Sequence, residues 1–541
     1  MIDFQLLLES CVAADAKVLD AEQAQQKYGK GTEGIVRKIS AAVIVKQQQD
    51  IGSLLLRANE LADTENAFVI YPVSSGHNWG YGSALPASDA LPAVIVDLSQ
   101  LKAIPFFDKE AGLVTVEPGV TQADLRHFLD QQGAATLMVP VTGAGPGCSI
   151  LGNALERGYG ITPHTDHFAA VTSLKAYLPT GEKYQSALCE LDLSGSEMAD
   201  KCYKWGLGPY LDGLFTQSGF GVVTEMSIRL REKPSGFDSF YLRFAEDSDL
   251  EVAVDLVAAI LKEQEGIVGS INLMDRRRVI SMIAPNPNGP QTHRVMTESQ
   301  VAQLAKKHDI PAWTAAGSIY GTQGVVAAAR KDIKRRLRGI KCQAIFSSGL
   351  LINAGRMAVA WAPSSLLKKE RGLIKALDKG IEVMQGIPNE VAMPLCYWRT
   401  ERPEGMASLD PARDSCGLFW YAPLVPMKKA KIRELVELVR TLCTKHNIEP
   451  MVTLTNFRHD CSDSTIPIVF NMRQPDAVRD ARNCLNELLS EGLKIGLVPY
   501  RLNIEQQGTL LDADTVFWKT VGRIHKVIDP GKVLMRGRYG A

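Results

Sequence analysis

The sequence has 541 residues, of which 45% are hydrophobic and 22% are charged. This length exceeds one ordinary hydrophobic core and predicts two large domains, and the composition is typical of a globular protein. Lysine plus arginine and aspartate plus glutamate number 60 each. No net charge therefore draws the chain to nucleic acid or to a membrane surface, and we expect neither as a partner.

The first residues contain no basic segment followed by a long apolar run, and no stretch approaches the ~18 consecutive apolar residues of a membrane span. This pattern predicts a cytoplasmic protein. The ten cysteines are scattered singly, without a CxxC pair. Such spacing indicates free thiols in a reducing compartment, and it predicts neither a disulfide framework nor a metal site.

Taken in chain order, the first half alternates strands and helices. Residues 41–63 predict a short strand followed by a helix, and the next apolar strand leads directly into a glycine-rich segment, 72–82. Residues 93–104 and 113–129 repeat the pattern of strand, turn and helix, with Thr121 as the expected helix N-cap. Further on, residues 173–184 predict a hairpin.

The pattern changes after a strand that ends at Pro234. Long helices then alternate with strands of antiparallel type, which favours an α+β domain. The helices are expected at 248–264, 322–339, 428–447 and 477–492. A last helix at 515–530 precedes a tail rich in glycine and arginine.

Two glycine-rich segments, 72–82 and 147–158, are the strongest functional signal. Each places glycines beside serine and asparagine after an apolar run. Glycine lets a backbone approach a phosphate closely while its N–H groups point inward. Two such segments predict a long cofactor with a pyrophosphate and two aromatic ends.

In this order, short motifs of the sequence resemble the vanillyl-alcohol oxidase / p-cresol methylhydroxylase family of FAD enzymes. The likeness runs from about residue 40 to the C-terminus. The motifs are 78–82 (NWGYG), 116–120 (VEPGV), 151–158 (LGNALERG), Thr162-Pro163 with Asp166-His167, 208–213 (GPYLDG), 384–388 (MQGIP), Tyr500-Arg501 and Asp529-Pro530. Eight ordered matches in both halves of the chain are far more specific than one glycine-rich loop.

The resemblance implies an α+β, two-domain FAD-binding PCMH-type fold with an α+β cap (substrate) domain. The expected domains are an FAD-binding domain at 1–235, a cap domain at 236–499 and a C-terminal segment at 500–541 that returns to the FAD domain. An FAD-dependent oxidoreductase is the implied activity, since FAD carries the redox step.

The same resemblance assigns cofactor-binding residues. The pyrophosphate is expected at Ser74, Ser75, Gly76, His77 and Asn78. The ribityl chain and the flavin ring are expected beside Gly147, Cys148, Ser149, Gly152, Asn153, Arg157, Gly158 and Gly160. Backbone contacts are expected from Phe220, Gly221 and Val222, and Arg536 or Arg538 would stabilise the reduced anionic flavin.

At the substrate end, the resemblance implies that Tyr81, Tyr500 and Arg501 bind a para-substituted phenol as its phenolate. Two phenolic hydroxyls and a permanently charged guanidinium are suited to lowering a phenol pKa. The ionised ring would then release hydride from its benzylic carbon and become a quinone methide. Tyr81, Tyr500 and Arg501 are therefore the predicted catalytic residues.

Two departures from the family pattern affect this interpretation. Relatives carry an acid just before the second glycine-rich segment, whereas residues 139–147 here contain none. Either His164, Asp166 or His167 serves as the base, or no base is needed, although a histidine beside an aspartate is more often structural. Relatives also attach the flavin through a His or Tyr where this sequence has Leu418.

Leucine cannot form that bond, so FAD is expected to be held non-covalently. Tyr421 or Cys416 would be the linking residue only if the alignment were shifted. Four aromatic residues, Trp398, Trp420, Tyr421 and Phe470, either line the substrate cavity or pack in the core. The segment 458–460 either reaches the site or is a solvated loop, and the basic run 331–338 is expected on the polar face of an amphipathic helix.

The electron acceptor stays open between O2 and a cytochrome c subunit, and a homodimer is expected by analogy with relatives. Two alternatives also stay open. The flavoenzyme could oxidise a different alcohol, a hydroxy acid or a biosynthetic intermediate. The chain could instead be a catalytically silent flavin-fold subunit, which the presence of Tyr81, Tyr500 and Arg501 disfavours.

Overall fold

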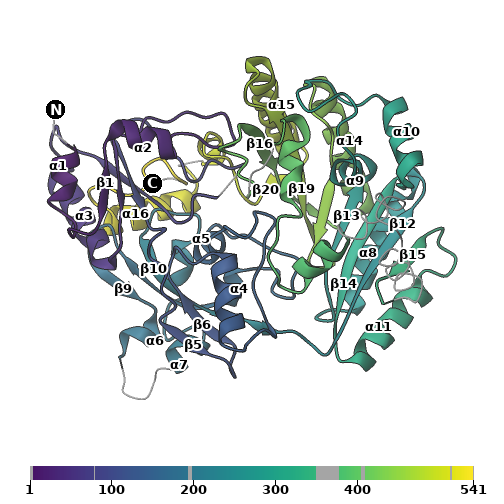
Figure 1. Cartoon of the computed structure of the whole chain (residues 1–541), viewed down its shortest axis with the longest axis horizontal. Coiled ribbons are helices and arrows are strands. Elements are labelled where there is room, and N and C mark those ends of the chain that lie inside the picture. The colour runs from purple at the N-terminus through teal and green to yellow at the C-terminus, as the bar shows by residue number, and fades with distance from the viewer. Residues whose placement is uncertain are drawn as a thin grey trace. The chain divides into compact units, whose positions relative to one another are not determined.

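The computed structural model describes residues 4–77, 80–192, 198–348, 377–403, 408–511 and 514–539 (Figure 1). The chain divides into two compact units. Met1–Gly160, Asp166–Glu232 and Asn503–Ala541 form the first unit, and Ile161–Thr165 and Lys233–Leu502 form the second. Asn78, which the sequence placed in the pyrophosphate site, lies outside the described residues.

The first unit contains a four-stranded sheet with the order β1-β2-β4-β3 among its described residues. These strands are β1 (Lys17–Leu19), β2 (Ala41–Ile44), β4 (Ala93–Asp97) and β3 (Val69–Val73). β2, β4 and β3 run parallel, as expected for strands joined by helices, and β1 is antiparallel. The helices α1 (Phe4–Glu9), α2 (Ala21–Tyr28) and α3 (Gln48–Leu61) supply apolar side chains to its core.

A second sheet in this unit is antiparallel, with the order β5-β6-β10-β8-β9. Its strands are β5 (Phe106–Asp108), β6 (Leu113–Val116), β10 (Val222–Arg229), β8 (Val171–Tyr177) and β9 (Lys183–Gln185), and a two-stranded sheet pairs β7 (Leu137–Met138) with β11 (Arg231–Glu232). The predicted cap of α4 (Gln122–Gln131) is confirmed, because Thr121 and Asp124 form a reciprocal capping box. The short helices are α5 (Ile150–Leu155), α6 (Ala187–Glu190), α7 (Ala199–Cys202), η1 (Phe168–Ala170) and η2 (Asp212–Phe215).

The C-terminal segment belongs to this first unit, where Leu534 pairs with Ile70 of β3. Helix α16 (Val516–Ile528), in yellow in Figure 1, precedes the residues that make this pairing. The fully buried Asp529 carboxylate accepts hydrogen bonds from the backbone N–H groups of Val533 and Leu534, at 3.0 and 3.1 Å. The Asp529-Pro530 motif therefore fixes the turn that sends the tail along the sheet.

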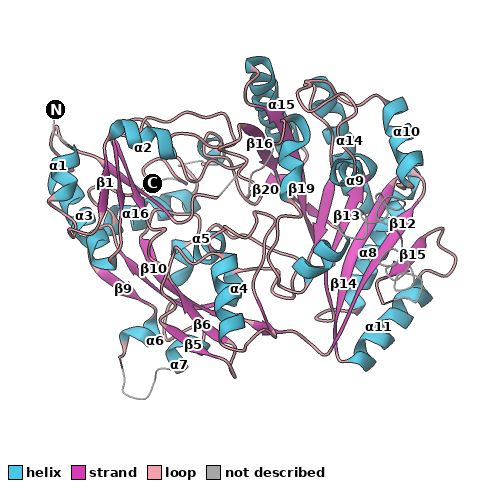
Figure 2. Cartoon of the chain, in the orientation of Figure 1, coloured by secondary structure: helices cyan, strands magenta, loops and turns pink. Residues whose placement is uncertain are grey.

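The second unit is built on one antiparallel sheet, with nine strands among its described residues. The order is β15-β12-β14-β13-β18-β19-β17-β20, and β16 pairs with β19 beside that path. The bounds are β12 (Gly236–Phe244), β13 (Val268–Asp275), β14 (Trp313–Gly321), β15 (Gln343–Phe346), β16 (Cys416–Tyr421), β17 (Pro423–Pro426), β18 (Thr453–Asn456), β19 (Cys461–Asn471) and β20 (Val498–Pro499). Figure 2 shows these strands in magenta.

Four helices of the second unit, α8 (Leu250–Glu263), α11 (Gln323–Arg336), α14 (Lys429–Lys445) and α15 (Pro475–Lys494), pack against one face of this sheet. The unit also contains α9 (Arg276–Ile283), α10 (Glu298–His308) and η4 (Met393–Arg399). The four long helices predicted from the sequence correspond to α8, α11, α14 and α15. Their apolar side chains share one core with every second residue of the strands.

Strand alternation places three of the four aromatic residues that the sequence left open, whereas Trp398 is a buried residue of the 3-10 helix at Met393–Arg399. Tyr421 and Phe470 belong to the helix-covered core, where Phe470 stacks on Phe419 at 5.3 Å between ring centroids. Leu418 and Trp420 alternate with these residues and lie on the other face. We call this other face the polar face, because it carries Asn272, Thr453, Thr455, Asp463 and Thr465.

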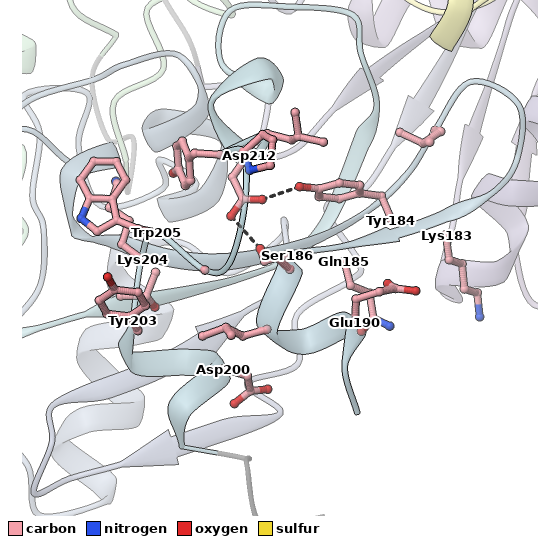
Figure 3. A pocket seen from close by; sticks show the side chains of 18 of the residues that line it. Lys183, Tyr184, Gln185, Ser186, Glu190, Asp200, Tyr203, Lys204, Trp205 and Asp212 are labelled. Atoms are coloured by element: carbon pink, nitrogen blue, oxygen red, sulfur yellow. Dashed lines mark hydrogen bonds between the residues drawn. The ribbon is translucent and has the colours of Figure 1, made fainter. Parts of the chain in front are cut away.

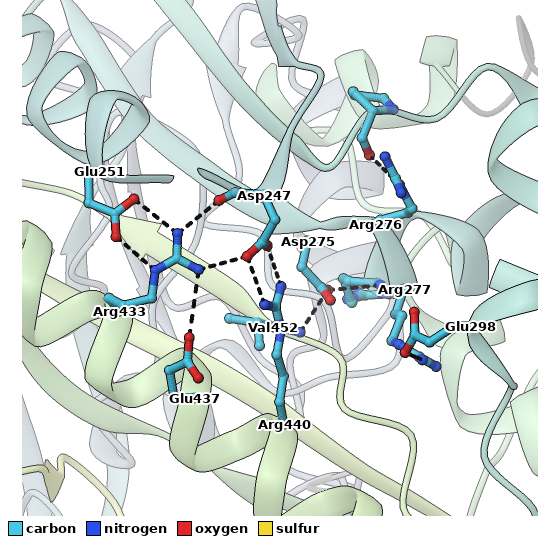
Figure 4. A network of polar contacts seen from close by, with 12 residues as sticks. Asp247, Glu251, Asp275, Arg276, Arg277, Glu298, Arg433, Glu437, Arg440 and Val452 are labelled. Atoms are coloured by element: carbon cyan, nitrogen blue, oxygen red, sulfur yellow. Dashed lines mark hydrogen bonds and ion pairs between the residues drawn. The ribbon is translucent and has the colours of Figure 1, made fainter. Parts of the chain in front are cut away.

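A network of ion pairs ties the start of α8 to α14 (Figure 4). Arg440 donates two hydrogen bonds to the Asp247 carboxylate, at 2.6 and 3.0 Å, and Arg433 donates one at 2.8 Å. Arg433 also holds Glu251 through a bidentate pair, at 2.7 and 2.9 Å. The hydrogen bonds from Arg440, followed by those from Arg433, lower the pKa of Asp247 to about 2.

This network predicts a stability that is lost on acidification. Because the pKa of Asp247 is lower in the folded than in the unfolded chain, its stabilisation is present above about pH 4 and disappears as the pH falls toward 2. We expect Asp247→Asn to lower the midpoint of thermal unfolding at pH 7 and to lower it progressively less below pH 4. Scanning calorimetry at several pH values measures this.

The matched control is Asp255→Asn, which removes an exposed ion pair with Lys429 in the same unit. Exposed single pairs contribute little, so its midpoint should follow the wild type. An Asp247→Asn variant with a midpoint difference that does not depend on pH would contradict the role of this carboxylate.

Candidate cofactor and substrate site

The two glycine-rich segments meet in the first unit. The backbone N–H of Ser149 donates to Ser75 Oγ at 3.1 Å. A Cβ atom at Gly152 would lie 2.5 Å from Ser74 Oγ, and one at Gly147 would lie 3.3 Å from the His77 ring. Glycine therefore eases this close approach, which joins two distant parts of the sequence into one surface.

Backbone donors are available on this surface. The N–H groups of Gly76 and His77 have no acceptor among the residues that the structure describes, and both residues are exposed. Gly76 has a φ of +71°, a conformation that lets successive N–H groups converge. Converging donors without internal acceptors fit the oxygen atoms of a pyrophosphate.

The second segment, expected as a loop, contains the helix α5. Ser149 caps this helix by accepting a hydrogen bond from the N–H of Gly152 at 3.0 Å, and it donates to the Pro118 carbonyl at 2.6 Å. The neighbouring Cys148 is buried. The glycine-rich sequence therefore predicted the close approach of the two segments but did not predict the helix α5.

Two glycines later in this segment are explained by packing. The Asn153 side chain, hydrogen-bonded to His167 Nδ1 at 2.5 Å, occupies the space where a Cβ of Gly158 would lie. At Gly160 a Cβ would collide with the Val141 carbonyl. His167 is buried and bonded to Asn153, in agreement with the structural interpretation of this histidine.

The other candidate bases differ in position. Asp166 is exposed and accepts a hydrogen bond from the backbone N–H of Ala169 at 3.0 Å, so it caps a turn. His164 belongs to the short segment Ile161–Thr165 of the second unit. Asp166 and His167 therefore both have structural hydrogen bonds.

The arginines of the site make defined contacts within the first unit. Arg538 is buried and pairs with Glu156, and burial lowers the pKa of its guanidinium to about 10. Arg157 adopts a φ of +53° and donates through Nε to Thr216 Oγ1 at 3.1 Å. The Arg536 carbonyl accepts a hydrogen bond from the Tyr71 hydroxyl at 2.6 Å. The C-terminal tail thus reaches the second glycine-rich segment.

The predicted backbone partners lie where β10 begins. Val222 pairs with Tyr177 of β8, and a Cβ at Gly221 would collide with the Phe215 ring. The Phe220 ring lies 5.4 Å from that of His525 on α16. Burial lowers the pKa of the His525 imidazole.

Glu33 supports Tyr81, and the sequence analysis did not single it out. Its Oε1 accepts hydrogen bonds from the N–H groups of Gly80 and Gly82, at 2.8 and 2.9 Å, and from Thr32 Oγ1 at 3.1 Å. Glu33 is fully buried, and this burial raises the pKa of its carboxyl group. One side chain therefore fixes the backbone on both sides of the buried Tyr81.

In the second unit, Tyr500 and Arg501 follow β20. The N–H of Tyr500 donates to the Ala422 carbonyl at 3.2 Å, which extends the pairing of β20 with β17. Arg501 is buried, with 8% of its surface exposed. The segment 458–460 is a solvated loop, since Arg458 and Asp460 pair with each other and are both exposed.

The GPYLDG motif surrounds a cavity of about 350 Å³ in the first unit (Figure 3). Asp212 accepts hydrogen bonds from the Tyr184 hydroxyl and Ser186 Oγ, at 2.6 and 2.7 Å. Lys204 donates to the Phe168 carbonyl at 2.6 Å. None of the described lining residues is a predicted site residue, so this motif stabilises the unit and lies outside the predicted cofactor surface.

Comparisons with known proteins agree with this arrangement. A family model described as an FAD binding domain matches residues 39–185. The chain is 30% identical over 477 residues to 1'-carboxy-chondrochloren decarboxylase of Chondromyces crocatus, with 88% of this chain and 86% of that protein covered. It is 25% identical over 511 residues to the flavoprotein subunit of 4-cresol dehydrogenase [hydroxylating] of Pseudomonas putida, covering 93% and 88%.

The chain belongs to the vanillyl-alcohol oxidase / p-cresol methylhydroxylase family. A solved structure of 4-ethylphenol oxidase from Gulosibacter chungangensis shares its fold, with a TM-score of 0.85, 19% identity, and coverage of 100% of this chain and 98% of that one. The predicted α+β PCMH-type fold and the FAD cofactor are thereby confirmed, and the protein is an FAD-dependent oxidoreductase.

Two observations bear on the other expectations for this family member. Among the residues that the structure describes, no helix combines the length and apolar character that crossing a membrane requires. Within the same residues, no three His, Cys, Asp or Glu side chains gather as metal ligands would.

The role of Glu33 can be tested with two variants. Glu33→Ala removes the acceptor of the buried Gly82 N–H, at a cost of about 1–3 kcal/mol, and leaves the Gly80 N–H with Thr32 Oγ1 as its acceptor. We expect faster amide hydrogen exchange in peptides covering 80–85. Glu33→Gln keeps an acceptor oxygen and should restore slow exchange; equal exchange in all three proteins would refute this role.

Proposed function

We propose that this protein abstracts hydride from the benzylic carbon of a para-substituted phenol, of the 4-alkylphenol or 4-hydroxybenzyl alcohol type. The observation that carries this proposal is the pair Tyr500 and buried Arg501, held at the end of β20 in a chain similar to a 4-cresol dehydrogenase flavoprotein over 93% of its length. A solved structure with the same fold is that of a 4-ethylphenol oxidase, and 4-ethylphenol, like 4-cresol, is a para-alkylphenol.

In this proposal Tyr81, Tyr500 and Arg501 bind the phenol oxygen. The Arg501 guanidinium supplies a cation beside the phenol oxygen, and two hydroxyl donors add hydrogen bonds that favour the ionised oxygen. Ionisation pushes electron density through the ring to the para position, so the benzylic hydrogen can leave with its electron pair. Bound FAD supplies the acceptor for this hydride.

FAD itself is held, in the same proposal, by the surface that joins the two glycine-rich segments. Ser74, Ser75, Gly76 and His77 take the pyrophosphate through their N–H and hydroxyl groups. The stretch from Gly147 to Gly160 and the start of β10 hold the rest of the cofactor. Arg538 lies beside Glu156 in that stretch, so either it or Arg536 is placed to balance the charge of reduced flavin.

The flavin is proposed to be non-covalent. Leu418, at the family's linking position, is fully buried and carries no nucleophile. Tyr421 packs in the helix-covered core with its hydroxyl against Gly492, and burial raises the pKa of the Cys416 thiol to about 12. Neither alternative therefore has the position or the ionisation that a linkage requires.

Acid precipitation tests the flavin linkage. Because no nucleophile faces the linking position, we expect trichloroacetic acid to release all the yellow colour into the supernatant. The measurement is the flavin absorbance of the supernatant and of the redissolved pellet. Colour that stays with the pellet would show a covalent bond and overturn the assignment.

A second candidate function is oxidative decarboxylation, which the 30% identity to 1'-carboxy-chondrochloren decarboxylase favours. A phenol with a carboxylate one carbon beyond the benzylic position would first lose hydride from the benzylic carbon. The bond to the carboxylate would then break and release CO2, and its electron pair would restore the phenolate and form a vinyl group. This route needs no attacking water, in agreement with the absence of an acid in 139–147.

Anaerobic reduction of the flavin distinguishes these functions. We expect 4-alkylphenols to bleach the wild-type flavin, and Arg501→Ala to slow the bleaching at least about a hundredfold while FAD stays bound, because the phenolate loses its cation. Arg458→Ala, which removes an exposed arginine of the same unit, should behave as the wild type. The measurement is stopped-flow absorbance of the flavin.

The substrate arms of this experiment decide between the candidates. Bleaching only by 3-(4-hydroxyphenyl)propanoate-type acids, with release of CO2, would favour the decarboxylase. No bleaching by any phenol, or an unimpaired Arg501→Ala variant, would overturn the phenolate site.

The electron acceptor needs a separate measurement. Release of peroxide in air would identify O2 as the acceptor, and reduction of a cytochrome c would identify that protein as the partner. A cytoplasmic location and a homodimer complete the proposal.

A further inference from the structure

Asp463 on β19 is a buried carboxyl group to which the proposed function assigns no role. Only 7% of its surface is exposed, and its Oδ1 has no hydrogen-bond partner among the residues that the structure describes. Asn272 Oδ1 and Thr453 Oγ1, on the same polar face, are likewise buried without a partner in the described chain. Burial of such groups is unfavourable, so a cluster of them indicates an external partner.

The register of the sheet shows which residues surround Asp463. One row of direct neighbours across the sheet runs Asn272, Thr455, Asp463, Leu424, Val498. The adjacent row on the same face runs Met274, Thr453, Thr465, Ala422, Tyr500, with the last two positions given by the continuous register of β17 and β20. Asp463 and Tyr500 therefore share the polar face.

The separation of these two residues suits the length of a substrate. Two strand spacings across the sheet and two residues along it place the Cα atoms of Asp463 and Tyr500 about 12 Å apart. A para-substituted phenol carries its reacting carbon at the opposite end of the ring from its oxygen. A base for that carbon must stand away from Tyr500 and Arg501, as Asp463 does.

The surroundings keep the Asp463 carboxyl basic. Its direct neighbours on β18 and β17, Thr455 and Leu424, carry no charge, and Cys461 is the titratable residue two positions before it on β19. Burial without an adjacent cation raises the pKa of Asp463 well above its ordinary value. A carboxyl group of this kind can accept a proton near neutral pH.

We propose that Asp463 is the catalytic base at the benzylic end of the substrate. The proposal rests on the proposed phenol oxidation and supplies the proton acceptor that residues 139–147 lack. It also explains why Asp166 and His167 are free to serve structural hydrogen bonds.

With a 4-alkylphenol, the proton that Asp463 accepts comes from water. After hydride has left for FAD, a water oxygen forms a bond to the benzylic carbon, and one O–H proton of this water passes to Asp463. The electron pair of the exocyclic double bond returns to the ring and restores the phenolate. For a 4-hydroxybenzyl alcohol, Asp463 takes the alcohol proton as hydride leaves, and the C–O bond becomes the aldehyde carbonyl.

Asp463→Asn separates hydride transfer from proton transfer, because asparagine keeps the size of the side chain and removes its basicity. With a 4-alkylphenol we expect flavin reduction within about threefold of the wild type, whereas formation of the hydroxylated product falls at least about a hundredfold. The acid limb of the pH–rate profile should also disappear. Asp460→Asn, in an exposed ion pair three residues away, is the matched control and should match the wild type.

Product formation and pH dependence equal to the wild type in Asp463→Asn would overturn the proposal. Equal slowing of reduction and product formation would also overturn it, because a merely structural role predicts that result. If no phenol reduces the wild-type flavin, the proposed function fails, and infrared spectra still test Asp463. A carboxyl band that titrates near neutral pH and is missing in Asp463→Asn supports a basic buried carboxyl; full ionisation down to pH 4 excludes it.

Discussion

Backbone packing between segments 74–77 and 147–153 is the constraint on which the first unit depends. Ser75 Oγ accepts a hydrogen bond from the Ser149 N–H, and a Cβ atom at Gly152 would lie 2.5 Å from Ser74 Oγ. These contacts hold the two segments together. They fix the backbone N–H groups of the surface, and fixed N–H donors are what binding of a phosphate group requires.

The rest of the first unit holds this surface in place. Asp529 turns the C-terminal tail so that it runs beside β3, the strand that leads into the first segment. The same tail carries Arg538 to Glu156 beside the second segment. Residues near the C-terminus therefore support both halves of this surface, so the C-terminal segment is a structural part of this unit.

The second unit uses the two faces of one sheet for different purposes. One face is covered by helices and filled with apolar side chains, and this hydrophobic burial stabilises the unit. The other face carries polar side chains, among them buried atoms with no partner in the described chain. The proposed function assigns the substrate to this polar face. Tyr500 lies on that polar face.

The sequence by itself determined the elements with strong local signals. The periodicity of 248–264, 322–339, 428–447 and 477–492 predicted four helices that the structure contains, and Thr121 predicted a cap that forms. The resemblance carried by short motifs predicted the fold and FAD. These signals are local, because helix periodicity, capping and glycine spacing all act within a few residues.

Only the tertiary structure decided which single polar residues matter. Glu33 and Asp463 stand in segments without any motif, and their roles follow from contacts with residues that are distant in the sequence. Glu33 supports Tyr81 because the fold brings it to the N–H groups on both sides, and Asp463 shares a face with Tyr500 because of the register of three strands. Burial and strand register arise from long-range packing, and no local pattern of residues encodes them.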